Sequence, residues 1–433
     1  MKNSGVEWIG EIPDEWDIYR NKNAFICNKE IVGKNSNSTQ LLSLTTGGIK
    51  CKDINNAEGK LPESFDTYQY VKKNDVVMCL FDLDMSAVFS GISQYDGMIS
   101  PAYKVLSCQD RANPLFIHYW FSYIFDGRKF NHYAKNIRYT LNYNEFATLP
   151  ILLPPKSTQQ HIASYLDKKC SKIEETIQNQ QQVIEKLKAY KQSLITEAVT
   201  GKIKIENGKA CGEYESYKDS GVEWIGKIPS EWNLTKIAYI TTKIGSGKTP
   251  NGGAAIYIDE GVLFIRSQNV YNEGLLLDEP MFISDEIDDD MKSTRLANND
   301  VLLNITGGSI GRCCIYEKKY GRANVNQHVC IIRVIPTKVI PKFMQLFWIS
   351  KVGEISIDIY QTGGNREGMS GDAISKTLIP LPSMNEQKEI ADYLDKKCTA
   401  IDTAIEQKQE LIVKLTEYKK SLIYECVTGK KEI

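Results

Sequence analysis

The chain has 433 residues, of which 42% are hydrophobic and 25% are charged, and this composition excludes a disordered or fibrous protein. The length allows two or three domains with separate cores. The formal net charge of −1 excludes a uniformly basic nucleic-acid-binding chain, so any DNA-binding surface must be local or supplied by partners. No apolar run approaches transmembrane length, and the eleven cysteines include no CxxC pair. We therefore expect a reduced, cytoplasmic protein without a membrane segment.

A segment near the amino terminus occurs twice. KNSGVEWIGEIPDEW at 2–16 matches KDSGVEWIGKIPSEW at 218–232 in 12 of 15 positions. The repeated tryptophans suit either stacking on bases or anchoring the segment to a hydrophobic surface. Because identical anchors precede two dissimilar blocks, packing is the favoured interpretation. The tryptophans are Trp8, Trp16, Trp224 and Trp232.

The first block, about 17–156, mixes short apolar runs with turn residues. Its predicted strands are Gln40–Leu44, Asp75–Phe81 and Tyr103–Leu106, and Pro114–Phe125 is predicted as a helix. The segment Gly127–Tyr143 contains basic residues interspersed with aromatic residues, and it contains no acidic residue. The basic residues are Arg128, Lys129, Lys135 and Arg138. Basic groups neutralise phosphates and arginine can contact base edges, which favours DNA binding. A solvated helix with an aromatic stripe facing the core is equally compatible with this pattern.

Residues 157–202 are predicted as one long helix. Apolar residues recur at alternating steps of four and three from Leu166 to Ala198, which predicts the seam of a coiled coil. About 43 residues at 1.5 Å each give a rod of ~65 Å. Ser157 and Gln160 are spaced as a capping box, and Gly201 stands where a helix stop is expected. The seam includes Leu166, Ile173, Ile177, Gln180, Ile184 and Leu187.

The helix pattern returns at 385–430, 228 residues later, and both copies contain YLDKKC. A long amphipathic helix needs a partner, and its duplicate is the obvious one. Because folded blocks join the two helices, we expect them to pair antiparallel. Gln180 and Lys408 occupy matching polar seam positions and are hypothesised to fix the register, which replacing both by leucine would test. The second seam includes Leu394, Ile401, Ile405, Lys408, Ile412 and Leu415.

The second block, about 233–383, follows a polar, glycine-containing linker at 203–217. Its predicted strands are Ile256–Ile258, Val262–Ile265, Asp300–Ile305, Arg312–Tyr316 and His328–Val334. Stretch 301–333 contains five Lys/Arg against one acid, a local excess of +4, whereas Asp285–Asp290 is acidic and expected to face away from DNA. Four polar turns are suited to presenting side chains to bases. They are Arg266–Asn269, Thr306–Ser309, Arg322–His328 and Gln361–Arg366.

Several motifs that would indicate catalysis are incomplete. Gly247-Lys248-Thr249 lacks the earlier glycine of a phosphate-binding loop, and Pro250 follows, which favours a turn. Asn113-Pro114-Leu115-Phe116 resembles the Asn-Pro-Pro-Tyr/Phe motif of amino-methyltransferases, but Leu115 breaks it, and the chain has no FxGxG turn. The spacing of Asp300 and Glu317 faintly resembles a nuclease carboxylate cluster, but such a spacing often arises by chance and does not indicate a nuclease. The four histidines have no paired metal-ligand spacing. We therefore predict no catalytic residues and no metal site.

In combination, these segments resemble a specificity (S) subunit of a Type I restriction-modification system. The resemblance rests on SGVEWIGEIPDEW and SGVEWIGKIPSEW, the Leu-Pro block endings, Asn385-Glu386-Gln387 and the duplicated YLDKKC helices. It also rests on the RSQN, TGGSIG, NVNQ and TGGNREG turns of the second block. The first helix departs from the family pattern because Thr158 stands where the second has Glu386.

The resemblance implies a mixed α/β fold with two globular target recognition domains joined by two long antiparallel coiled-coil helices in a pseudo-twofold repeat. The expected parts are recognition domains at 1–156 and 218–384, spacer helices at 157–202 and 385–430, and the linker at 203–217. Such subunits bind a bipartite site on double-stranded DNA and recruit two modification subunits and two restriction subunits. Those partners hold the S-adenosylmethionine, ATP and magnesium, so no cofactor is expected in this chain.

The DNA-contacting residues predicted from these blocks form one set: Arg128, Lys129, Lys135, Arg138, Lys248, Arg266, Gln268, Asn269, Ser309, Arg312, Arg322, Asn326, Gln327 and Arg366. Two alternatives remain open at this stage. A methyltransferase with its own recognition domains would explain the imperfect Asn113–Phe116 motif. A structural coiled-coil protein would explain the helices, but not two dissimilar blocks behind nearly identical leaders.

Overall fold

The computed structural model describes residues 1–53, 62–86, 89–134, 139–250, 252, 256–361 and 368–433. The chain forms two compact units. Unit 1 contains residues 1–181 and 409–433, and unit 2 contains residues 182–408. Both units combine helices and strands, so the mixed α/β content predicted from the sequence is confirmed.

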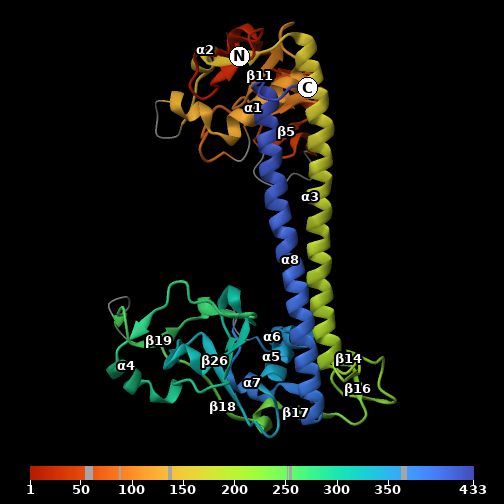
Figure 1. The fold of residues 1–433 in the computed structure, drawn as a ribbon, viewed down its shortest axis with the longest axis vertical. Helices are drawn as coiled ribbons and strands as arrows, with labels where there is room; N and C mark the ends of the chain where they lie inside the picture. The colour runs from red at the N-terminus through yellow and green to blue at the C-terminus, as the bar shows by residue number, and fades with distance from the viewer. Residues whose placement is uncertain (54–61, 87–88, 135–138, 251, 253–255, 362–367) are drawn as a thin grey trace. The chain divides into compact units, whose positions relative to one another are not determined.

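Two helices, α3 (Lys156–Val199) and α8 (Met384–Val427), have 44 residues each. Helix α3 begins in unit 1 and ends in unit 2, whereas α8 begins in unit 2 and ends in unit 1. Within each unit, their segments lie side by side and run in opposite directions (Figure 1). Every predicted seam position is buried or half-buried. The helices end shortly before Gly201 and Gly429, whose φ angles of 72° and 73° favour glycine and stop a right-handed helix.

The same ion pair joins the two helices in both units. In unit 1, Lys419 Nζ lies 2.5 Å from Glu174 Oε1, and in unit 2, Lys191 Nζ lies 2.7 Å from Asp402 Oδ2. The two lysines are 228 residues apart, as are the two acids, so the contact repeats with the sequence. Both lysines occupy polar positions of the predicted seam. Each extends to a carboxylate on the neighbouring helix, and the side-by-side arrangement therefore has the same register in both units.

Unit 1 encloses a core rich in aromatic side chains. Helix α1 (Pro114–Asp126) buries Phe116, Trp120 and Phe121 against a four-stranded antiparallel sheet and against α3 and α8. The sheet has the order β4-β11-β8-β9. These strands are β4 (Phe25–Asn28), β11 (Lys104–Cys108), β8 (Val76–Met78) and β9 (Ser90–Ile92). The prediction of a helix over Pro114–Phe125 is confirmed, and the strands at 75–81 and 103–106 are confirmed with different ends.

The remaining elements of unit 1 are short. Strand β3 (Asp17–Arg20) pairs with β12 (Pro150–Leu153), so the segment after the leader lies next to the segment that precedes α3. The others are β1 (Lys2–Asn3) with β2 (Glu11–Ile12), β5 (Leu42–Thr45) with β6 (Gly48–Cys51), β7 (Gln69–Val71) with β10 (Gly97–Ile99), and α2 (Tyr143–Thr148). Both chain termini lie in this unit (Figure 1).

Unit 2 contains two larger sheets. One is antiparallel with the order β18-β26-β23-β24, formed by β18 (Thr241–Ser246), β26 (Val329–Val334), β23 (Val301–Asn304) and β24 (Cys313–Ile315). The other has the order β22-β19-β25, formed by β22 (Phe282–Ile283), β19 (Val262–Ile265) and β25 (Ala323–Val325). Strands β19 and β25 run parallel, with Phe264 opposite Asn324. Their carboxyl ends therefore meet at one edge of the sheet.

Unit 2 also contains shorter strand pairs and several helices. The strand pairs are β13 (Ile205–Glu206) with β14 (Lys209–Ala210), β15 (Tyr217–Asp219) with β16 (Lys227–Pro229), β17 (Asn233–Lys236) with β27 (Leu378–Leu381), and β20 (Val270–Tyr271) with β21 (Gly274–Leu275). The helices are α4 (Asp285–Asp290), α5 (Pro341–Ile349), α6 (Lys351–Tyr360) and α7 (Gly371–Lys376). Helix α5 packs on β23 and β24 and buries Phe343, Phe347 and Trp348.

The tryptophans of the two leaders pack against protein. Trp8 Nε1 donates a hydrogen bond to Tyr133 Oη at 3.1 Å, and Trp224 Nε1 donates one to Ser356 Oγ at 3.1 Å. Trp16 and Trp232 are buried beside Gly429 and Gly201, the glycines that follow α8 and α3. The packing interpretation of the repeated tryptophans is confirmed. Each leader thereby fastens to the end of a long helix within its own unit.

The start of α8 has a cap that α3 lacks. Ser383 accepts a hydrogen bond from Glu386 N and donates one to Glu386 Oε2, and Glu386 Oε1 also accepts from Trp232 Nε1 at 3.1 Å and from the Tyr214 hydroxyl. In the first copy, Pro155 and Thr158 replace these two residues, and neither supplies such a cap. The predicted capping box of Ser157 and Gln160 is wrong: α3 begins at Lys156, and the Gln160 side chain bonds Asn113 and Ser164.

One predicted strand is absent from the structure. Ile256–Ile258 was expected to be a strand, but Ile256 and Tyr257 belong to no strand, and Ile258 forms only an isolated bridge to Phe282. Phe282 belongs to the short strand β22, which pairs with β19, so Ile258 lies at the edge of this existing sheet. The apolar residues therefore contact an existing sheet without forming a strand of their own.

Candidate nucleic-acid interface

Three of the four predicted polar turns converge in unit 2. The turn Arg266–Asn269 follows β19, and Thr306–Ser309 follows β23. The predicted turn Arg322–His328 is correct only in its last part, because residues 323–325 form strand β25 and Asn326–His328 joins β25 to β26. Asn326 N donates to Ile265 O at 3.0 Å, and Ile305 N donates to His328 O at 3.0 Å. We call these three segments the turn cluster. Gln361 is described, but the rest of the fourth turn, including Arg366, lies outside the described residues.

Asn304 at the end of β23 connects two turns of the cluster. Its side chain is 0% exposed, and Nδ2 donates to Ser267 O at 2.8 Å and to Ser309 Oγ at 3.1 Å. Its backbone N–H donates to Arg312 O at 2.9 Å. Sequence analysis did not single out Asn304. The available signal was an asparagine inside the apolar run VLLNI, because a buried amide requires hydrogen-bond partners.

The third turn and the Gly247-Lys248 segment adjoin the same cluster. His328 Nδ1 lies 2.6 Å from Thr306 Oγ1, which links the third turn to the second. Lys248 N donates to Val325 O at 3.1 Å. A β-carbon at Gly247 would overlap the carbonyl oxygens of Val325 and Asn326, so glycine is required by this close approach. Residues 247–250 are not helical, and most of the residues that directly follow them lie outside the described part of the chain, so the predicted turn stays a prediction.

The predicted side chains of the cluster divide by exposure. Lys248, Gln268 and Gln327 are exposed. Arg266, Ser309 and Arg312 are half-buried, and the guanidinium of Arg312 lies over the Tyr271 ring at 4.4 Å from its centroid. Asn269 and Asn326 are buried and stabilise the turns themselves: Asn269 accepts from Arg266 N, and Asn326 accepts from His328 N. The exposed groups are therefore the ones available to an external ligand.

The cluster also contains buried polar atoms without a partner. Arg266 Nε and Asn304 Oδ1 are buried, and neither has a hydrogen bond to any described residue. An unsatisfied buried donor or acceptor costs about 1–3 kcal/mol. Such groups are uncommon in a purely structural turn, and a bound water or ligand would satisfy them.

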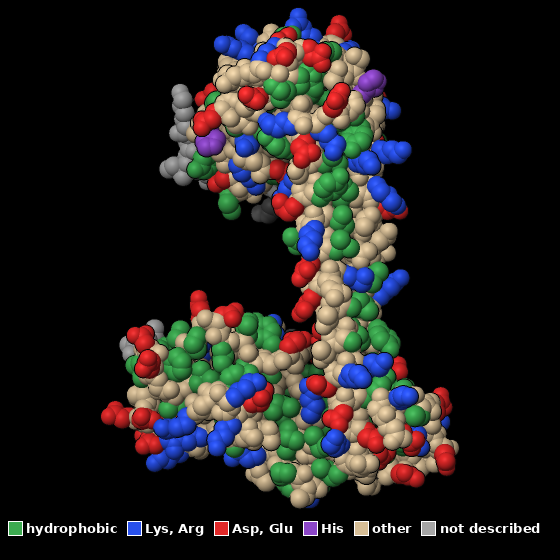
Figure 2. Space-filling view, viewed as in Figure 1, with side chains coloured by type: hydrophobic (Ala, Val, Ile, Leu, Met, Phe, Trp, Pro, Cys, Tyr) green, Lys and Arg blue, Asp and Glu red, His purple; other side chains and the backbone are tan. Residues whose placement is uncertain are grey.

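The local charge excess predicted for 301–333 is largely neutralised by acids from elsewhere. Arg322 pairs with Asp285 and Asp288 of α4, and Arg333 pairs with Asp300. Lys319 pairs with Glu317 inside the stretch. Figure 2 shows basic and acidic side chains mixed on the surface of unit 2 near α4. A net count along the sequence missed this compensation because Asp285 and Asp288 lie more than 30 residues before Arg322.

In unit 1, the basic-aromatic segment packs largely onto its own unit. Arg128 donates through NH1 to Leu83 O and lies over the Phe125 ring at 4.2 Å, and Lys129 lies near the Tyr123 ring. Phe130 is buried in the core, and Tyr133 accepts from Trp8. Phe130 and Tyr133 therefore follow the core-facing interpretation, whereas Tyr139 is exposed. Lys135 and Arg138 lie outside the described residues.

The residues of the incomplete catalytic motifs have structural roles. The Asn113 side chain caps α1 by accepting from Leu115 N and Phe116 N. Asp300 is buried and accepts from Arg333 and from Ala297 N. Across the residues that the structure describes, no three His, Cys, Asp or Glu side chains are grouped to hold a metal ion. A search of the same residues finds no helix with the length and apolar character needed to span a bilayer.

A cleft of about 600 Å³ in unit 1 is lined in part by the half-buried His118. Burial lowers the pKa of His118, and Lys419 lowers it further, whereas Glu174 and Asp167 act in the opposite direction. The unfolded chain therefore binds a proton more readily than the folded protein below the ordinary histidine pKa of about 6.5. The folded state loses stability as the pH falls through this range towards the folded pKa. At higher pH both states hold a neutral imidazole and the effect disappears.

We expect His118→Gln to reduce the loss of stability on acidification. Urea unfolding midpoints measured at pH 7.5 and pH 5.5 provide the test, with the exposed His132→Gln as the matched control. The wild-type protein and the control should lose more stability between the two pH values than His118→Gln. An identical loss in all three proteins would contradict a contribution from this imidazole.

Comparisons with known proteins agree with this fold. Residues 229–413 match the family model described as Type I restriction modification DNA specificity domain. The chain is 25% identical to the EcoBI specificity subunit of Escherichia coli over 285 residues, which cover 64% of this chain and 57% of that protein. It is 22% identical to the putative MjaX specificity subunit of Methanocaldococcus jannaschii, with 98% of this chain and 95% of that protein covered.

Two solved structures share the fold. A chain from a study of assembly and conformational transition in a type I R-M system gives a TM-score of 0.71 at 13% identity, covering 96% of this chain and 98% of that one. The HsdS subunit of Thermoanaerobacter tengcongensis gives 0.52 at 14% identity and covers 100% of both chains. In these aligned regions the chain is therefore similar to type I restriction-modification specificity subunits.

Proposed function

We propose that this chain is the DNA sequence-specificity subunit of a type I restriction-modification complex. Two target recognition domains, at 1–156 and 218–384, each bind one half of a bipartite site. The antiparallel spacer helices at 157–202 and 385–430 form a coiled coil that sets the distance between half-sites, and 203–217 links the repeats. The observation that carries the proposal is the convergence of three polar turns in unit 2, fixed by Asn304 and by the parallel strands β19 and β25.

The cluster has the chemistry that base recognition needs. Glutamine side chains such as those of Gln268 and Gln327 present a donor and an acceptor together, which suits adenine, and arginine suits guanine. Lys248 beside the cluster supplies a positive charge for a phosphate. Arg266, Ser309 and Arg312 extend the surface, while the buried Asn269 and Asn326 hold its shape. In the first domain, Arg128 and Lys129 are proposed contacts, together with Lys135, Arg138 and, in the second domain, Arg366.

The repeated helices suit two copies of one partner. Similar helix surfaces, one in each repeat, would allow two modification subunits to dock in the same way. The repeated Lys–carboxylate pairs give the helix pair the same local register in each unit, which supports such docking. Two restriction subunits complete the proposed complex. S-adenosylmethionine, ATP and magnesium are assigned to these partners.

Methylome sequencing of cells that carry the chain with its partners provides the test. We expect one bipartite motif with a fixed spacer. Gln327→Ala should relax one position of one half-site, at a cost of about 1–3 kcal/mol in discrimination. The exposed Gln178→Ala on α3 is the matched control and should leave the motif unchanged. A motif without two half-sites would contradict the proposal.

Two further measurements separate the alternative functions. An isolated chain that bound S-adenosylmethionine would support a self-contained methyltransferase, although Asn113, the residue that favoured it, is used as a helix cap. A chain that failed to shift DNA in gels with its modification partner present would support a purely structural coiled-coil protein.

A further inference from the structure

Arg322 lies at the opposite end of its strand from the turn cluster. It immediately precedes β25 (Ala323–Val325), whose carboxyl end leads into Asn326–His328. Arg322 O accepts from Leu263 N at 3.0 Å, so this end of β25 is also joined to β19. At about 3.3 Å per residue, the backbone of Arg322 is roughly 13 Å from that of Asn326 along the strand. A side chain at this end is poorly placed to contact a base held by the turns.

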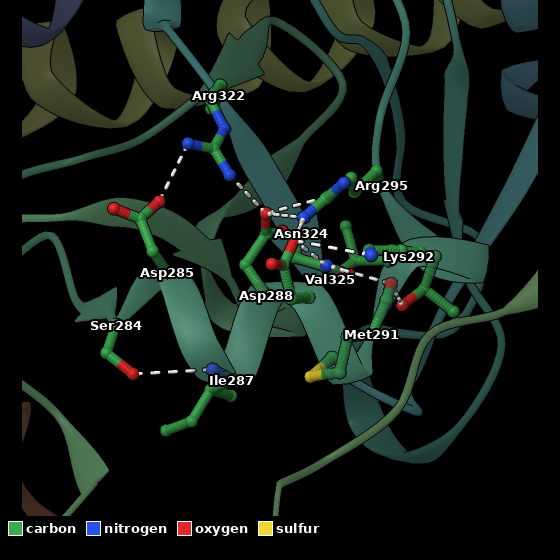
Figure 3. A network of polar contacts seen from close by, with 12 residues as sticks. Ser284, Asp285, Ile287, Asp288, Met291, Lys292, Arg295, Arg322, Asn324 and Val325 are labelled. Carbon is green, nitrogen blue, oxygen red and sulfur yellow. Dashed lines mark hydrogen bonds and ion pairs between the residues drawn. The ribbon is translucent and has the colours of Figure 1, made fainter.

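The Arg322 guanidinium is held by two acids of α4 (Figure 3). NH1 lies 2.7 Å from Asp285 Oδ1, and NH2 lies 2.6 Å from Asp288 Oδ2. The acids are three residues apart on one helix, so they face the same side and match the two arms of the guanidinium. The Asp285 side chain is 78% exposed and that of Asp288 only 1%. The contact to Asp288 is therefore the one that solvent screens less.

Asp288 extends this contact into β25. Its Oδ1 accepts from Asn324 Nδ2 at 3.0 Å, and its Oδ2 also accepts from Arg295 Nε at 2.7 Å. Asn324 is buried in the middle of β25, opposite Phe264 of β19. A buried carboxylate is stable only when several donors satisfy it, and here three side chains do so. The position of β25 is thereby fixed relative to α4 at both Arg322 and Asn324.

We propose that Arg322 is a positioning residue for sequence recognition and not a DNA contact. Together with Asp285 and Asp288, it sets the position of β25 along β19, and hence the position of Asn326 and Gln327 relative to the turn Arg266–Asn269. This role rests on the proposed function of the turn cluster. It differs from the prediction made from the sequence, in which Arg322 was one of the DNA-contacting residues. The acidic run 285–290 then serves to hold the recognition strand.

Arg322→Lys distinguishes the two roles. A phosphate contact needs only positive charge, so lysine should preserve DNA binding. A positioning role needs two guanidinium arms, because one ammonium group cannot reproduce the fork that spans Asp285 and Asp288. We therefore expect Arg322→Lys and Arg322→Gln to have similar effects. Asp285→Asn, which removes the negative charge of the exposed partner, should act in the same direction more weakly. The exposed Lys318→Gln removes one charge in the same region and is the control.

The measurement is DNA binding by the full chain assembled with its modification subunits, on the target site, on single-base variants and on unrelated DNA, over a range of salt. We expect both Arg322 variants to lose roughly 5- to 150-fold of discrimination at positions of one half-site. Affinity for unrelated DNA and the salt dependence should stay as in the wild type. Thermal melting of each variant shows whether unit 2 remains folded.

Three outcomes would overturn the proposal. Equal weakening on all sequences, with the salt slope reduced by about one, would identify Arg322 as a phosphate contact. Normal behaviour of Arg322→Lys alongside a defective Arg322→Gln would show that charge alone matters. Unchanged discrimination in both variants would remove the positioning role. A wild-type complex without any sequence preference is a separate result, because it contradicts the proposed function as well.

Discussion

Leu166→Ala is expected to lower the free energy of unfolding by about 2–5 kcal/mol, as large-to-small substitutions in a core do. Leu166 is 0% exposed and belongs to the cluster that contains Phe116 and Trp120 of α1 and Leu422 of α8. Its removal leaves a cavity where three helices meet. Urea or thermal unfolding of the full chain measures the loss.

The sequence repeat supplies a second site for this experiment, and an exposed leucine of α8 supplies the control. Leu394 occupies the equivalent place in the second YLDKKC segment and is also 0% exposed, so Leu394→Ala should cost a similar amount in unit 2. Leu411 on α8 is 41% exposed and outside the seam, and Leu411→Ala should change stability by less than about 0.5 kcal/mol. If Leu166→Ala costs no more than Leu411→Ala, the seam does not hold unit 1 together.

Gly201→Ala and Gly429→Ala are expected to destabilise units 2 and 1, respectively, by about 2–4 kcal/mol each. Two effects contribute. Both glycines have positive φ, which costs a residue with a β-carbon about 1–2 kcal/mol. In addition, the new β-carbon would overlap Pro229 at Gly201 and Pro13 at Gly429, next to the buried tryptophan of each leader. The leader must then move away from the helix end.

Gly221→Ala separates strain from overlap. Gly221 has a φ of 73°, close to that of Gly201, but a β-carbon there would meet nothing within 4 Å. The control should therefore show only the backbone cost. Differential scanning calorimetry of the three variants, with the buried tryptophans as a fluorescence probe of the leaders, measures both contributions. Equal losses at Gly201 and Gly221 would mean that the leader–helix contact adds nothing to stability.

The duplicated elements were predictable because their signal is periodic and local. Both long helices follow from the apolar repeat, with ends within three residues of those predicted from Val-Thr-Gly-Lys and the Leu-Pro endings. The tryptophan anchors follow from the recurrence of one leader before dissimilar blocks. The false capping box at Ser157 shows the limit of such patterns: two suitable residues were present, but the helix had already begun at Lys156.

The arrangement within the second block was only partly predictable. The turns could be recognised from glycine and asparagine, but their convergence depends on the parallel pairing of β19 with β25, which are about 60 residues apart in sequence. The partner of Arg322 depends on α4 lying beside β25, which charge counting cannot reveal. Asn304 was overlooked because its role arises from burial next to two turns. The positions of these side chains thus depend on contacts between segments far apart in the sequence, which local composition does not reveal.

The division of the chain between the units has a consequence for synthesis. Unit 2 is continuous, whereas unit 1 requires residues 409–433 to complete a core that begins with the first residues. At roughly 5–20 residues per second, the ~230 intervening residues take on the order of 10–50 s to emerge from the ribosome. The first residues of unit 1 are therefore translated first, but the core of unit 1 is completed only when residues 409–433 have been made. Its aromatic surfaces stay uncovered for this interval, so a nascent chain that stalls late is the form most in need of a chaperone.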